Sequence, residues 1–325
     1  MMCTFWLMLL LGLFIYDSDS QFCYFNPTTF ETSDQFFLVG ALLGLAIYNS
    51  TILDVALPPF AFKKLLAAAP AATAATHSLS RTPFSPTLED LAEYRPALAN
   101  GLRQLLEFEG DVESTFCRDF VVEIDRYGKI ESVPLLPNGE NRAVTNSNRQ
   151  EFVDLYVRYL LDVSVSRQFE PFKRGFFTVC GGNALSLFRP EEIELLVRGS
   201  DAPLNLDTLR GVAVYDNWID PETGKPIPDP ATNVPVLRWF WEFFEVAGPP
   251  DQRRILSFIT GSDRIPAVGA ASLIIKISCL GDDCDRYPTA RTCFNQLCLW
   301  NYGRRAKFVE KLWGAVTESE GFGLK

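Results

Sequence analysis

The pattern of the sequence changes at residues 199–203, Gly-Ser-Asp-Ala-Pro, and this change most constrains the fold. Before it, apolar residues recur at helical spacing, most clearly at Phe152, Leu155, Tyr156, Tyr159, Leu160 and Val163. After it come a Pro-rich loop, an aromatic helical run over 237–244, and the strand-like runs SLIIKIS and NQLCLW. A helix stop containing Gly and Pro is typical of a linker. We therefore predict a mostly helical first lobe over 1–198, a linker over 199–203 and a smaller α+β second lobe over 204–325.

Within the first lobe, the segment from Phe36 to Tyr48 is apolar on nearly every side, which is expected for a helix buried inside a large domain. Residues 67–86 break the periodicity with three prolines and a run of small residues, so we predict an Ala-rich surface insertion there. After it, Thr87 and Asp90 have the spacing of a helix capping box, and Pro96 is placed to open the next helix.

The composition is that of a globular chain and excludes several functions. Of the 325 residues, 47% are hydrophobic and 22% are charged, which allows a large core. Forty acidic against thirty basic residues leave a net charge of −10, so nucleic acid is not an expected partner. The only histidine, His77, lies in a run of Ala, Ser and Thr where an imidazole would be hard to hold in place. Catalysis with a histidine base is therefore nearly excluded, as are zinc sites with histidine ligands.

The eight cysteines are an even number, but a chain of 325 residues builds a core without disulfides and their spacing shows no dense framework. We interpret them as reduced thiols. The late group, Cys279, Cys284, Cys293 and Cys298, could form a four-thiolate zinc site, but its pair spacings are longer than those of the usual CxxC knuckle. We therefore predict no metal and no cofactor.

Residues 1–16 carry no charge and resemble a secretion signal. They lack the basic first part of such a signal, and no cleavage site of small residues follows before Asp17. Sixteen residues are also fewer than the ~20 needed to cross a bilayer. We expect no membrane association and interpret the segment as the hydrophobic edge of a core, although a membrane-tethered or secreted protein remains an alternative that rests on these residues alone.

Seven segments follow one another in the order and near the spacing of one family. They are FFLVGALLGLAIYNSTILDVALP (36–58), LLEFEGDVE (105–113), VTNSNRQEFVDLYV (144–157), FKRGF (172–176), LFRPEEIELLVRG (187–199), FITGSDRIP (258–266) and PTARTCFNQLCL (288–299). Together they resemble the HECT ubiquitin ligases over almost the whole chain from Gly12 to the end. The resemblance implies a bilobal ligase domain, in which an N lobe binds a ubiquitin-conjugating enzyme. A flexible hinge follows it, and the linker at 199–203 lies where this hinge is expected. A C lobe then takes ubiquitin onto a cysteine as a thioester and passes it to a substrate lysine.

The last of these segments resembles the loop that holds the family's catalytic cysteine, which implies that Cys293 forms the thioester. Transfer between two thiols is nearly balanced in free energy, so the acceptor must chiefly be an exposed and correctly placed thiolate. Thr292 and Asn295 can position the thioester carbonyl or donate hydrogen bonds to its oxygen. Phe322, between two glycines near the carboxyl end, matches an aromatic residue that supports delivery to lysine in the family. The alternative is that Cys293 is one more buried small hydrophobe.

The family's docking surface for the conjugating enzyme maps onto Leu98, Leu102, Phe108, Phe152 and Tyr156. Periodicity alone indicates an apolar stripe at these positions, which is more often core than interface. Arg118 occupies a position where the family is often apolar, so we expect a different partner preference.

The chain also departs from the family pattern. The family domain begins before Gly12 with helices that pack under the N lobe, so we predict an N lobe that is truncated at its start. Near the cysteine, Arg291 replaces a common His, Trp300 a common Pro and Tyr287 a common Leu. Two hypotheses follow: an active ligase, or an inactive binding module that holds a conjugating enzyme or ubiquitin without completing transfer. The expected partners are a conjugating enzyme, ubiquitin and a protein substrate, in the cytoplasm or the nucleus.

Overall fold

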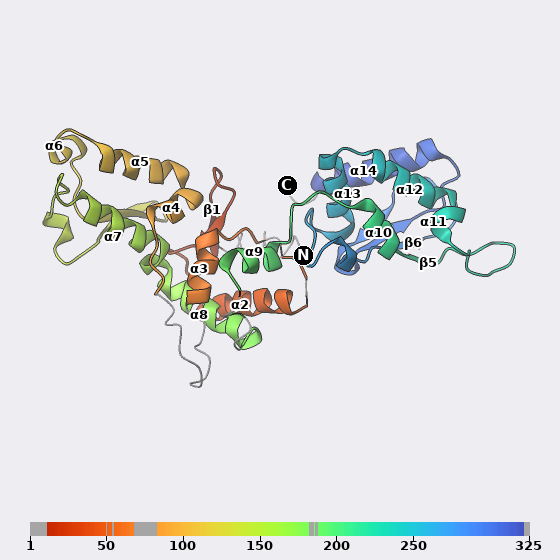
Figure 1. Cartoon of the computed structure of the whole chain (residues 1–325), viewed down its shortest axis with the longest axis horizontal. Helices are drawn as coiled ribbons and strands as arrows, with labels where there is room; N and C mark the ends of the chain where they lie inside the picture. Colours follow the sequence, from red (N-terminus) through yellow and green to blue (C-terminus); the bar gives the residue numbers. More distant parts are fainter. Residues whose placement is uncertain are drawn as a thin grey trace. The chain divides into compact units, whose positions relative to one another are not determined.

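The structure is a computed structural model, and it describes residues 12–49, 51–53, 55–67, 83–181, 185 and 188–321 (Figure 1). Contacts divide these residues into two compact units. The amino-terminal unit contains 12–49 and 55–194, and the carboxyl-terminal unit contains 51–53 and 195–321. The boundary lies between Glu194 and Leu195, shortly before the predicted hinge. Helices combined with small sheets confirm the α+β fold class, whereas the extent of the lobes and the flexibility of the hinge stay predictions.

The amino-terminal unit is mostly helical. Its helices are α2 (Ser33–Tyr48), α3 (Pro59–Ala67), α4 (Leu88–Tyr94), α5 (Pro96–Glu107), α6 (Val112–Phe116), α7 (Arg149–Leu161), α8 (Ser166–Val179) and most of α9 (Pro190–Arg198). Strands β1 (Phe14–Tyr16) and β2 (Cys23–Phe25) form one antiparallel pair, and β3 (Val121–Arg126) and β4 (Lys129–Pro134) form another. The predicted starts of two helices are confirmed: Thr87 and Asp90 form the capping box of α4, and Pro96 opens α5.

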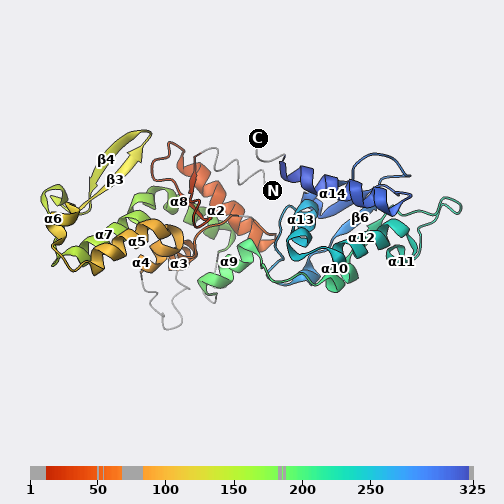
Figure 2. The same ribbon diagram turned by 90° about the horizontal axis from the view of Figure 1, so that it is seen from above.

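The central packing contact of this unit is the crossing of α2 and α8, which lie side by side (Figure 2). A Cβ atom built on Gly40 of α2 would lie 1.9 Å from the carbonyl oxygen of Phe172. One built on Gly175 of α8 would lie 1.9 Å from the carbonyl oxygen of Phe37. The two backbones therefore meet directly, at a distance that only glycine allows.

The prediction that the helix over 36–48 is buried all round is wrong for one face. The side of α2 that contains Phe36, Val39 and Leu43 is buried, but Leu38, Leu42, Leu45 and Tyr48 on another side are exposed. The pattern failed here because both faces of the helix are apolar, and helical periodicity does not show which face another element covers.

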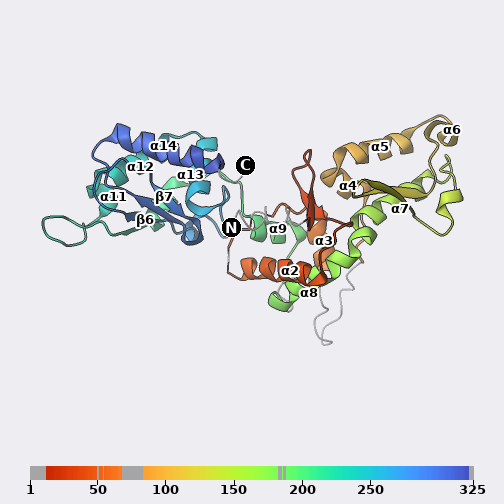
Figure 3. The same cartoon turned by 180° about the vertical axis from the view of Figure 1, so that it is seen from behind.

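The carboxyl-terminal unit is an α+β layer structure. Its strands β5 (Val214–Asp216), β6 (Lys276–Cys279), β7 (Thr289–Arg291) and β8 (Gln296–Leu299) form one sheet in the order β5-β6-β8-β7. Only the β7–β8 pair is antiparallel. Helices α10 (Leu206–Val212), α11 (Pro230–Asn233), α12 (Pro235–Val246), α13 (Pro249–Thr260) and α14 (Arg305–Gly321) complete it (Figure 3). The core joins helix residues such as Phe240 and Phe308 to strand residues such as Ile277 and Leu297, all fully buried.

Three predictions fall wholly or partly outside the described residues: the apolar amino terminus over residues 1–16, of which 1–11 are not described, most of the insertion at 67–86, and Phe322. They stay predictions. In the part of the chain that the structure describes, no helix has both the length and the apolar run that a bilayer crossing requires.

Candidate functional site

Cys293 lies at the tip of the hairpin that joins β7 to β8. Arg291 pairs with Gln296 across the two strands, so residues 292–295 form the connecting loop. The loop is a single 3-10 turn over Thr292–Phe294, and it ends at Asn295, whose φ of 48° is left-handed. Asn tolerates this conformation better than most residues. The turn leaves the Cys293 side chain exposed, so the alternative of a buried thiol is wrong.

The base of this hairpin is firmly held by the sheet. The carbonyl of Asn295 accepts a hydrogen bond of 2.9 Å from the backbone N–H of Lys276 in β6. Gln296 Nε2 donates to Ser278 Oγ over 2.6 Å. On the other side, Thr292 packs against Gly261 at the end of α13, where an added Cβ would lie 3.3 Å from the Thr292 Cβ. An exposed thiol thus lies on a loop whose two ends are fixed.

The residues around the thiol supply both polar and apolar surface. Among the described residues, the Thr292 hydroxyl and the side-chain amide of Asn295 form no hydrogen bond within the protein, so both can bind another group. The ring of Phe294, which the sequence reasoning did not single out, is 72% exposed directly beside Cys293. The sequence could have indicated Phe294 by its position next to Cys293. An exposed ring of this size offers a partner a large apolar contact.

A groove with a volume of about 420 Å³ lies in the amino-terminal unit between α5, α7 and β3. It brings together four of the five predicted docking residues, namely Leu98, Leu102, Phe152 and Tyr156. Leu105, Phe116 and Val121 also line it. Leu105 belongs to the same helical stripe as Leu98 and Leu102, so periodicity could have found it. Phe116 and Val121 come from elements that only the tertiary fold places here.

The groove has a buried floor and a more accessible edge. Phe152 is 3% exposed and Leu102 is 7% exposed, so both form the floor. Leu98 and Tyr156 are half-buried. Partial burial raises the pKa of the Tyr156 hydroxyl, and the charge of Arg118 acts in the opposite direction. Phe108 is not in the groove: its ring contacts Phe116 edge-on at 5.3 Å between ring centres.

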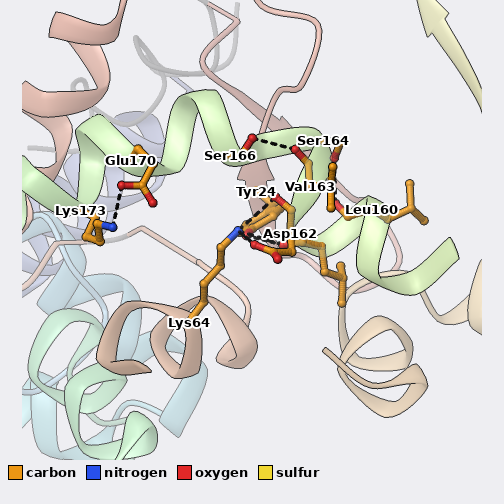
Figure 4. Close-up of polar contacts among 10 residues, drawn as sticks. Tyr24, Lys64, Leu160, Asp162, Val163, Ser164, Ser166, Glu170 and Lys173 are labelled. Atoms are coloured by element: carbon orange, nitrogen blue, oxygen red, sulfur yellow. Dashed lines mark hydrogen bonds and ion pairs between the residues drawn. The ribbon is translucent and has the colours of Figure 1, made fainter. Parts of the chain in front are cut away.

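A second pocket, of about 220 Å³, contains a buried lysine (Figure 4). Lys64 of α3 is 5% exposed, and its Nζ pairs with Asp162 Oδ1 at 2.9 Å. It also donates to the carbonyl of Leu161 at the end of α7, which accepts a second hydrogen bond from the Tyr24 hydroxyl. The ammonium lies 4.3 Å from the centre of the Phe169 ring. Burial lowers the pKa of Lys64, but its protons are already bonded to α7, so we interpret it as a structural cap of that helix.

The seven cysteines in the described residues are free thiols, and Cys117 and Cys293 are the exposed ones among them. Cys117 lies in the amino-terminal unit directly after α6. Cys293 is thus the exposed thiol of the carboxyl-terminal unit within its described residues.

A family model described as the HECT domain (ubiquitin-transferase) matches residues 5–325. The chain therefore belongs to this family, as the sequence resemblance predicts. It is 40% identical over 316 residues to a probable E3 ubiquitin-protein ligase HECTD2 of Mus musculus, covering 97% of this chain and 39% of that protein. It is 36% identical over 330 residues to a probable E3 ubiquitin-protein ligase mug30 of Schizosaccharomyces pombe, with the same two coverages. A probable E3 ubiquitin-protein ligase HERC3 of Homo sapiens is 37% identical over 314 residues. The chain spans about two fifths or less of the length of these relatives.

Proposed function

We propose that this chain is a ubiquitin-protein ligase that accepts ubiquitin from a conjugating enzyme as a thioester on Cys293 and transfers it to a lysine of a protein substrate. The observation that carries the proposal is the exposed thiol at the tip of a firmly held hairpin, in a chain of the HECT ubiquitin-transferase family. The similarity to proteins named as probable E3 ubiquitin-protein ligases favours this function over that of a binding module.

The chemistry proceeds in two balanced steps. The Cys293 thiolate attacks the thioester carbonyl at the end of ubiquitin, a new carbon–sulfur bond forms, and the conjugating enzyme leaves as a thiolate. The amine of a substrate lysine then attacks the new thioester and loses a proton, and Cys293 leaves as a thiolate when the isopeptide bond forms. Thr292 and Asn295, whose side-chain polar groups have no partner among the described residues, can donate hydrogen bonds to the carbonyl oxygen in both steps. Phe322 is proposed to support the second step.

The groove between α5 and α7 is the proposed docking surface for the conjugating enzyme. It is concave and lined mostly by apolar residues, with accessible edges at Leu98 and Tyr156, which suits an apolar side chain of a partner. The groove lies in the amino-terminal unit and Cys293 in the carboxyl-terminal unit. We therefore propose that the predicted N lobe binds the conjugating enzyme and the predicted C lobe carries the thiol. The predicted hinge between them lets the docked enzyme and the thiol approach each other.

The test is incubation of the protein with a conjugating enzyme charged with fluorescent ubiquitin. We expect a reductant-sensitive adduct with the native chain, a reductant-resistant ester or no adduct with Cys293→Ser, and none with Cys293→Ala. The matched control is Cys117→Ala, which removes the other exposed thiol and should leave the adduct unchanged.

A sensitive adduct that persists in Cys293→Ala would show that the assignment of the thiol is wrong. Binding of a conjugating enzyme by the native chain with no adduct under any condition would instead support the binding module.

A further inference from the structure

The edge of the docking groove contains two opposite charges. Arg118 and Glu123 both line the groove, both are exposed, and within the described residues neither side chain forms a hydrogen bond or an ion pair. Some other charges of this unit are paired, such as Arg126 with Glu131 on the same hairpin and Arg142 with Glu151. The groove therefore has one unpaired cation and one unpaired anion beside an apolar floor.

Both charges lie close to the accessible aromatic ring of the groove. The charge of Arg118 lowers the pKa of Tyr156 and that of Glu123 raises it, so each acts on the same hydroxyl. Val121 and Glu123 are alternate residues of β3, which places both side chains on the face of the strand that lines the groove. A partner that inserts an apolar side chain beside Tyr156 will therefore meet both charges at the edge.

We propose that this groove selects a conjugating enzyme whose apolar docking residue is flanked by a carboxylate, which pairs with Arg118, and by a basic side chain, which pairs with Glu123. The inference rests on the proposed function, because it assigns a partner chemistry to the same groove. The argument is charge complementarity: opposite charges at an interface edge accelerate association and fix the register, and like charges reject a wrong partner. The chain as a whole carries a net charge of −10 and repels acidic surfaces. The unpaired Arg118 therefore favours a partner with a carboxylate at this one place.

The experiment compares charge reversals in the full chain. Conjugating enzymes charged with fluorescent ubiquitin are first screened against the native chain, and the one that loads Cys293 fastest serves as the probe. Loading rates at subsaturating probe are then measured for Arg118→Glu, for the neutral variant Arg118→Gln and for Glu123→Lys. The matched control is Arg158→Glu, which makes the same charge change on α7 at an exposed residue that does not line the groove.

We expect Arg118→Glu to slow loading about five-fold or more, Arg118→Gln to have a smaller effect, and Arg158→Glu to stay within about two-fold of the native rate. Raising the salt concentration should narrow these differences, because it screens exposed charges. The decisive result is rescue. Surface acids around the docking residue of the probe are changed to Lys one at a time, and one such variant should load Arg118→Glu faster than it loads the native chain.

Equal loading by Arg118→Glu and Arg158→Glu would overturn the inference and leave the ligase proposal intact. A slow Arg118→Glu that no acid-to-Lys change of the probe rescues would overturn it as well. If no conjugating enzyme loads the native chain, the proposed function fails and the inference fails with it.

Discussion

Tyr156 and Phe152 are four residues apart on α7, so both rings face the same side of the helix, and they contact each other at 5.6 Å between ring centres. Sequence spacing predicts this much, and the family resemblance implies that both are docking residues. Their burial differs, however, because Phe152 also packs edge-on against Phe120, which precedes β3. Only the tertiary fold brings Phe120 to this place. Phe152 is therefore a core residue at the floor of the groove, and Tyr156 is the accessible one.

This difference predicts that alanine at Tyr156 will chiefly affect binding, whereas alanine at Phe152 will chiefly affect stability. Tyr156→Ala should weaken binding of the conjugating enzyme by about 1 to 3 kcal/mol and leave the melting temperature nearly unchanged. Phe152→Ala should lower the free energy of unfolding by about 3 to 5 kcal/mol, because it leaves a cavity in the core. Thermal melting and binding titrations measure the two effects. Tyr159→Ala, on the same helix but outside the groove, is the control. A large loss of stability in Tyr156→Ala would show that Tyr156 is a core residue and not an accessible docking residue.

The proposed catalytic residue was easier to find from the sequence than the residues that shape the groove. Cys293 stands in a distinctive segment, and the structure leaves it exposed. Glu123, in contrast, has no local signal, because it lines the groove only after β3 packs near α5 and α7. Sequence patterns report which residues share one element, and a groove is made where elements meet.

At the scale of elements, the helices with end signals were predicted well, and the environment of α2 was not. Thr87 and Pro96 act locally, so their effect on the chain could be read directly from the sequence. The contact of α2 with α8 depends on glycines more than a hundred residues apart, Gly40 and Gly175, and no local pattern joins them. Glycine weakens a helix, but because it has no Cβ it lets two helix backbones meet directly.

Gly175→Ala should therefore be strongly destabilising. The new methyl group would lie 1.9 Å from the Phe37 carbonyl oxygen, so α2 and α8 would have to separate. Overpacking of this kind costs about 1 to 3 kcal/mol or more in the free energy of unfolding. The matched control is Gly101→Ala in α5, where an added Cβ meets nothing within 4 Å, and it should stabilise the helix by about 0.5 to 1 kcal/mol. Denaturant unfolding measures both, and equal effects of the two changes would show that the crossing tolerates a side chain.

At the scale of the whole molecule, the change of sequence pattern at 199–203 lies close to the boundary between the two units. The attachment of this segment was not predicted. The backbone N–H of Ser200 donates to the Ile265 carbonyl over 2.7 Å, and the N–H of Ile265 donates back over 3.0 Å. Arg253 donates to the carbonyls of Asp201 and Ala202. These bonds join residues far apart in sequence, and all of them lie within the carboxyl-terminal unit. The sequence of this segment predicts a flexible linker, but hydrogen bonds hold its backbone at Ser200, Asp201 and Ala202.

These hydrogen bonds predict that two variants will change the rate of the transfer step in opposite directions. If movement of the linker limits turnover, Arg253→Ala should accelerate transfer several-fold, because it frees the carbonyls of Asp201 and Ala202. Asp201→Pro should slow transfer, because proline stiffens the backbone, and this position donates no backbone hydrogen bond among the described residues. Single-turnover chase of preloaded protein measures transfer, and a binding titration checks that docking is unchanged.

The control for this pair is Arg254→Ala, which removes the neighbouring arginine, whose guanidinium pairs with Asp251 on the same helix at 3.5 Å. It changes the charge and the helix surface as Arg253→Ala does, but it leaves the bonds from Arg253 to the linker in place. Transfer should then stay closer to the native rate than it does in Arg253→Ala. If Arg253→Ala and Asp201→Pro both slow transfer, the fastened linker is needed to place the loaded thiol. If neither changes the rate, the limiting movement lies outside residues 199–203.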